Sequence, residues 1–131
     1  MHEESSIRAF AAPERVERYL TLLRSARGRT KLRSTLAHGF ELDLRFARQL
    51  AGADATPIAV ERLLRSLGAP DTCHCLSEDV KLDGRDLALH DALFAVIGHG
   101  MGTLISCIPG ELGYFEGEDR GAHYVLRRAA A

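Results

Sequence analysis

Apolar residues recur at helical spacing along the first part of the chain. Four of them form one stripe with i, i+3, i+4, i+7 spacing: Val16, Tyr19, Leu20 and Leu23. This spacing is typical of one face of an amphipathic helix, for which Pro13 suits the first turn and which Gly28 interrupts or ends. A second, short helix is predicted from Thr30 to Ala37, with Gly39 as the left-handed residue just past its end.

The next segment predicts two more helices. Three apolar residues recur every four positions: Leu42, Phe46 and Leu50. This repeat predicts a third helix from Glu41 to Ala51. The fourth helix has the clearest boundaries, because Thr56 is placed to cap it and Pro57 occupies its first position. Gly68 followed by Pro70 should end it.

After Pro70 the apolar pattern changes. The segment from Thr72 to Leu76 is short and apolar, which is consistent with a strand, and Ser77 to Gly84 is a polar connection. From Arg85 to Ile97 the apolar residues cover most of a helical circumference, so a central, buried helix is predicted there. The glycine-rich segment from Gly98 to Gly102 should then form a loop.

Three strands are expected to complete the chain as an antiparallel meander. Their ranges are 103–108, 112–116 and 123–127. Pro109 and Gly110 join the first two of them in the order that favours a type II turn. The expected fold is α+β in one domain, residues 1–131. A helical half, residues 1–69, should pack on a small β-α-β-β-β sheet formed by the β-rich half, residues 70–131.

Composition is that of an ordinary globular domain. The 131 residues are 46% hydrophobic and 27% charged, with a formal net charge of −1. These values exclude a disordered chain and a strong overall field toward nucleic acid. The charge is nevertheless divided along the chain. Residues 1–67 carry 12 basic and 8 acidic side chains, whereas residues 68–131 carry 5 and 10.

The chain also indicates a cellular location. The segment from Met1 to Ser6 is acidic and polar, the opposite of the start of a signal peptide, and no apolar run approaches the length of a membrane span. The three cysteines are an odd number, which does not suit a disulfide framework. We therefore expect a cytoplasmic protein without a membrane partner. The strong preference for arginine over lysine suggests a GC-rich bacterial source.

A basic run offers one candidate binding site. Five cationic residues without an intervening acid fall within ten positions: Arg24, Arg27, Arg29, Lys31 and Arg33. Arginine suits phosphate, and the amides at the start of the predicted second helix point to the same corner. Arg27, Arg29, Lys31 and Arg33 are therefore the candidates for binding phosphate or nucleic acid. The alternative interpretation is a solvated helix face.

The cysteines offer a possible metal site. Cys73 and Cys75 would share one face of a strand, and Cys107 with His99 would have to complete a zinc site. Structural zinc sites usually contain two spaced pairs of ligands, a pattern that this chain lacks. We therefore expect no cofactor and no metal site, with the cysteines as small apolar residues of the core.

Histidines and one glutamate form the candidate catalytic cluster. Pairing of the predicted strands places Thr103 opposite Glu116, and so brings Glu116 close to the glycine loop that carries His99. A backbone loop of this kind can also present N–H groups to an anion. His90 shares a stripe with apolar residues and should face protein rather than solvent. It is either a hydrogen-bonded core histidine or a proton carrier.

These patterns lead to two hypotheses of function. The first is a small binding or interaction module that associates with itself, or with another protein, through its oppositely charged surfaces. The alternative is a small hydrolase or nuclease-like enzyme that acts on a phosphorylated or nucleotide ligand. In that enzyme the basic run would hold phosphate, and His99, His90 and Glu116 would transfer protons.

Overall fold

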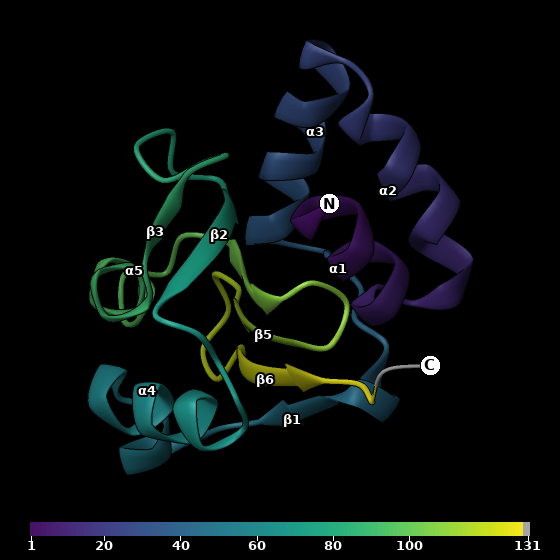
Figure 1. Ribbon diagram of the computed structural model, residues 1–131. Helices are drawn as coiled ribbons and strands as arrows, with labels where there is room; N and C mark the ends of the chain where they lie inside the picture. Colours follow the sequence, from purple (N-terminus) through teal and green to yellow (C-terminus); the bar gives the residue numbers. More distant parts are fainter. Residues whose placement is uncertain (130–131) are drawn as a thin grey trace.

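The structure, a computed structural model, describes residues 1–129 (Figure 1). The α-helices are α1 (His2–Phe10), α2 (Val16–Leu23), α3 (Ala26–Ala37), α4 (Pro57–Ser66) and α5 (Leu89–Val96). Short 3₁₀ turns are η1 (Pro13–Arg15), η2 (Leu44–Phe46) and η3 (Gly52–Ala55). The strands are β1 (Ala47–Gln49), β2 (Thr72–Ser77), β3 (Asp86–Ala88), β4 (Thr103–Ile108), β5 (Leu112–Glu116) and β6 (His123–Arg127).

The strands form one antiparallel sheet in the order β1-β6-β5-β4-β2-β3. The α+β fold and the C-terminal meander are therefore confirmed. The sheet is larger than predicted, because β1 comes from the helical half and β3 adds an edge strand. Thr103 lies opposite Glu116, as the expected pairing required.

Helices cover both faces of the sheet (Figure 1). The first core joins α1, α2 and α3 to one face of the sheet and includes Ile7, Phe10, Leu20, Leu32, Leu36 and Phe115. The second joins α4 and α5 to the other face and includes Val60, Leu64, Leu93, Ile105, Tyr114 and Val125. Successive side chains of a strand point to opposite faces of the sheet, so the strands contribute residues to both cores.

The predicted helix from Glu41 to Ala51 is wrong. Leu42 and Phe46 pack with the first core, whereas Leu50 belongs to the second. The chain therefore crosses the edge of the sheet within this segment, and β1 forms where it pairs with β6. A repeat of four fits one helical face, but here its members fill two separate cores.

Two other helices differ from their predicted ranges. The segment from Arg85 to Ile97 divides into β3 and α5, because its first residues pair with β2. Gly28 does not end a helix but lies in the first turn of α3, where its N–H donates to the hydroxyl of Ser25, the N-cap. A Cβ on Gly28 would overlap the carbonyl oxygen of Leu22, so glycine permits the close approach of α2 and α3.

Helix α1 lies outside the elements predicted from the sequence, and its nine residues lack a side-chain N-cap. The fourth helix is confirmed. The hydroxyl of Thr56 accepts from the Ala59 N–H, and Gly68 has a φ of +104° just beyond the end of α4. Within residues 1–129, every helix is too short or too polar to cross a bilayer.

Candidate functional site

The carboxylate of Glu116 lies at the end of β5 with only 1% of the residue exposed. Its oxygens accept from the backbone N–H of Gly98 at 3.3 Å and of Gly100 at 3.2 Å. The glycine loop therefore does present N–H groups to an anion, as predicted, but that anion is a side chain of the protein itself.

Tyr114 and His123 complete the surroundings of this carboxylate. The Tyr114 hydroxyl donates to Glu116 at 3.0 Å, and His123 Nδ1 lies 3.0 Å from the same oxygen. Burial, then the neighbouring carboxylate, raises the pKa of Tyr114, so the phenol stays a donor. Neither residue was among the candidates predicted from the sequence, although strand pairing alone places His123 opposite Glu116.

Within residues 1–129, the side chains of the other two predicted catalytic residues make no hydrogen bond to Glu116. His99 is exposed on the glycine loop, and His90 lies in α5 with 57% of its side chain exposed, so the expected buried position of His90 is wrong. The Nδ1 atom of His90 lies 2.7 Å from Glu61 in α4, and its ring packs beside Phe94. Of the three predicted residues, Glu116 and the loop of His99 are brought together and His90 is separate.

Two of the four residues predicted to bind phosphate donate hydrogen bonds to groups of the protein itself. Arg29 donates through two nitrogens to Glu3 at 2.6 and 2.8 Å and through two to Asp83 at 2.9 and 3.1 Å. Arg33 donates to the backbone carbonyls of Ser77 and Glu78. Their guanidinium groups hold α3 against β2 and its following loop. Arg27 and Lys31, in contrast, are exposed beside a shallow hollow on α3.

A polar network joins α1 to the sheet. The imidazole of His74 in β2 lies between two carboxylates, with Nε2 2.7 Å from Glu3 and Nδ1 2.7 Å from Asp86. The hydrogen bond to Glu3 raises the pKa of His74 despite burial. Burial alone would raise the pKa of Glu3, but the hydrogen bonds from Arg29 and His74 lower it to about 2. Glu3, Arg29 and His74 each favour the charged form of their neighbours, which suits a structural network.

The cysteines lie in the core. Cys73, Cys75 and Cys107 are buried and free. Burial raises the pKa of Cys107 to about 12, and the hydrogen bond with Cys73 followed by burial raises that of Cys75. Across residues 1–129, no group of three or more potential ligands is placed to hold a metal ion.

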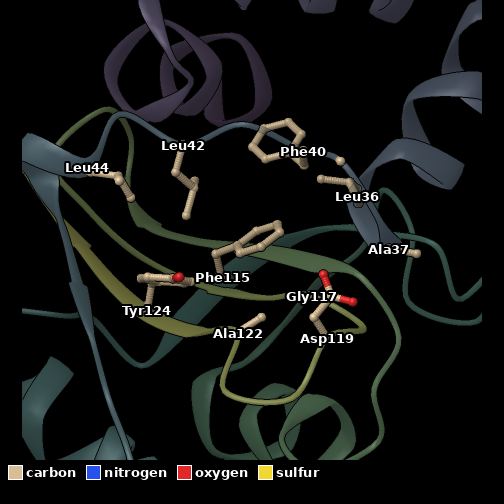
Figure 2. Close-up of a pocket in the computed structure, with 11 residues that line it drawn as sticks. Leu36, Ala37, Phe40, Leu42, Leu44, Phe115, Gly117, Asp119, Ala122 and Tyr124 are labelled. Atoms are coloured by element: carbon tan, nitrogen blue, oxygen red, sulfur yellow. The ribbon is translucent and has the colours of Figure 1, made fainter.

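A pocket of about 170 Å³ opens over β5 and β6 (Figure 2). Leu36 and Ala37 at the end of α3 form one side, and Phe40 and Leu42 lie on the segment that passes above the sheet. The remaining lining residues are Gly39, Leu44, Phe115, Gly117, Asp119, Ala122 and Tyr124. Asp119 is the one charged residue among them.

A second pocket, of about 240 Å³, lies beside the edge strand β1 on the α4 face. Its basic residues, which we call the arginine edge, are Arg45, Arg48 and Arg127. Phe46, Leu63, Leu67 and Val125 supply its apolar part. Arg48 lies opposite Val125, whose side chain belongs to the second core, and Arg127 follows two residues later on the same face.

The arginine edge has little internal compensation. Arg45 pairs with Asp43 at 2.7 Å. Within residues 1–129, neither Arg48 nor Arg127 has a carboxylate at ion-pair distance. Arg128 adds a further charge nearby, because its guanidinium lies over the Phe46 ring at 4.4 Å from the centroid.

Three exposed acids lie in or next to the elements at the opposite edge of the sheet: Asp71 just before β2, Asp86 in β3 and Asp91 in α5. We call these three residues the acidic edge. The side chains of Asp71 and Asp86 are 92% and 77% exposed. Arg65 pairs with Asp71 and His74 with Asp86, whereas Asp91 has no cationic partner in the described part of the chain.

No family model, curated protein or solved structure matches this chain.

Proposed function

We propose that the protein is a small interaction module that associates with further copies of itself through oppositely charged surfaces. The observation that supports this proposal is the position of charge on the sheet. The arginine edge lies at β1, and the acidic edge lies at β3, the other end of the strand order. The contact would place the arginine edge of one copy against the acidic edge of the next.

The edge strands themselves favour a contact through side chains. Each has three residues, and each carries a charged one, Arg48 in β1 and Asp86 in β3. Short, charged edges oppose backbone pairing between copies, so charge attraction is the main contribution to the contact. Such an association is weak and decreases with salt. Because the two surfaces differ, the contact is head to tail and can close into a ring.

The alternative, an enzyme for phosphorylated ligands, stays a prediction from the sequence. Arg29 and Arg33 donate to internal acceptors, and Glu116 is enclosed by its own hydrogen bonds. These contacts give that alternative no support. We keep the cytoplasm as the proposed location, because an odd number of cysteines does not suit a disulfide framework.

Sedimentation velocity at low and high salt tests the association. We expect oligomers in about 20 mM salt and monomers in about 500 mM salt, where the screening length falls to a few ångströms. Arg48→Glu should abolish the oligomers, and so should Asp91→Lys. The double variant, which exchanges the two charges, should recover part of the association.

Arg24→Glu provides the matched control, because it makes the same charge change at an exposed residue that follows α2. It should leave the oligomers unchanged. A protein that stays monomeric at low salt, or a double variant no better than either single one, would show that the proposal is wrong.

A further inference from the structure

The pocket of Figure 2 combines an apolar interior with a single acid. Phe115 and Tyr124 lie on the strands below, and Phe40 and Leu42 lie above them. Phe40 stacks on Phe115 with 5.4 Å between ring centroids, so this wall is firmly packed. The interior therefore offers apolar contact to a ligand without rearrangement.

Two features give the rim a negative potential. Asp119 lines the pocket, and its carboxylate pairs with no cation among residues 1–129. The end of α3, at Leu36 and Ala37, borders the same space and carries the partial negative charge of a helix C-terminus. The lining contains no lysine or arginine, although Arg120 follows Asp119 in the chain. A cation with an apolar stem fits this arrangement.

We infer that this pocket binds the side chain of a lysine or arginine presented by a partner protein. The alkyl stem lies against Phe40, Phe115 and Tyr124, and the charged end meets Asp119. The size is suitable, since an apolar cavity of about 150 Å³ accepts a benzene molecule and the pocket measures about 170 Å³.

This site is separate from the self-association surfaces. Its lining shares no residue with the arginine edge or the acidic edge. Binding here can therefore be measured at high salt, where the proposed oligomers are absent, and either proposal can fail while the other holds. High salt also weakens the attraction between the cation and Asp119. The titration is therefore repeated at low salt with Arg48→Glu, the variant that should not form oligomers.

The test uses the full chain and a blocked Gly-Lys-Gly tripeptide, with the norleucine tripeptide as its neutral counterpart. Amide NMR signals of Gly117 and Ala122 report on the site. We expect a dissociation constant on the order of 1 mM for the lysine peptide and about five-fold weaker binding of the norleucine peptide. Asp119→Asn should remove this preference. Asp54→Asn, an exposed acid outside the pocket, should keep it.

Three outcomes would overturn the inference. They are equal binding of the two peptides, an unchanged lysine preference in Asp119→Asn, and the absence of shifts at Gly117 and Ala122. n-Butylamine distinguishes the source of the cation. If it perturbs the same amides while the blocked tripeptide does not, the pocket accepts free amines and the inference of a partner protein is wrong.

Discussion

The imidazole of His74 and the carboxylate of Glu3 lie 2.7 Å apart, although their positions in the chain differ by 71. The contact fastens the first turn of α1 to β2. It is also protected, since the side chains are 17% and 19% exposed. Both ring nitrogens of His74 face carboxylates, so the protonated ring satisfies both contacts and the neutral ring satisfies one.

The contact predicts a decrease in stability as the pH rises. The pKa of His74 is raised above its ordinary value of 6.5, so its contribution is complete below about pH 6.5 and is lost as the pH rises through the folded-state value. His74→Gln should therefore cost about 1–3 kcal/mol at pH 6 and less at pH 9. Urea unfolding of both proteins across this range measures the difference.

His2 is the control for this prediction. Burial, then the charge of His74, lowers the pKa of His2, so its contribution has the opposite sign and is lost as the pH falls below 6.5. In His2→Gln the unfolding free energy should still decrease at high pH, as in the wild type. A free-energy difference between wild type and His74→Gln that stays constant from pH 6 to 9 would contradict the assigned role.

Glu3 gives a second pH dependence, at the acidic end. Its pKa of about 2 lies below the ordinary 4.5, so its contribution is present above pH 4.5 and is lost as the pH falls toward 2. Glu3→Gln should flatten the stability curve between pH 5 and 3. Glu4→Gln, at the neighbouring exposed position, should follow the wild-type curve.

Arg29 is predicted to stabilise the fold rather than to bind phosphate. Its guanidinium makes paired hydrogen bonds to both Glu3 and Asp83, which an ammonium group cannot reproduce. Arg29→Lys should therefore cost about 2–4 kcal/mol of unfolding free energy. Arg27→Lys, at an exposed position of the same helix, should cost less than about 0.5 kcal/mol. Similar costs for the two variants would contradict this role.

Glu116 is predicted to fix the glycine loop. Glu116→Gln keeps the shape of the side chain but replaces the carboxylate that accepts from the Gly98 and Gly100 amides and the Tyr114 hydroxyl, and should cost about 1.5–3 kcal/mol. Hydrogen exchange at the Gly98 and Gly100 amides should accelerate more than exchange in β4. Glu118→Gln changes an exposed acid two residues later and should leave both amides protected. Unchanged exchange in Glu116→Gln would show that the loop is held by other contacts.

Gly102 is predicted to be intolerant of any side chain. A Cβ there would overlap the backbone of Leu36 and Ala37, neither of which can move without displacing α3. Gly102→Ala should therefore cost more than about 3 kcal/mol, by analogy with overpacked cores. Gly39→Ala is the contrast, because Gly39 has a φ of +82° with open space around it and should cost about 1 kcal/mol. Thermal unfolding of the two variants gives the comparison.

The features that the sequence predicted well depend on nearby residues. The cap at Thr56, the first-turn Pro57 and the left-handed Gly68 all act within a few positions of α4. The meander likewise joins neighbours in the chain, so the pairing of Thr103 with Glu116 followed from short connections. From it came the correct placement of Glu116 beside the glycine loop.

The sites that the sequence analysis missed join distant segments. His74 meets Glu3 because α1 packs on β2, and no local pattern records that contact. Arg48 and Arg127 share a pocket because β1 pairs with β6 at the sheet edge. The repeat of Leu42, Phe46 and Leu50 misled for the same reason, since its members fill cores on opposite faces of the sheet.

The sequence by itself determined the α+β class, most of the strands and the division of charge between the two halves, because periodicity and composition are local properties. The tertiary structure alone decided which of those charges are exposed and which are paired within the protein. Antiparallel pairing places the basic β1 and the acidic β3 at opposite ends of one sheet, and it encloses Arg29, Arg33 and Glu116 in internal contacts. Which charges stay available to a partner follows from burial and pairing, which depend on residues far apart in the chain.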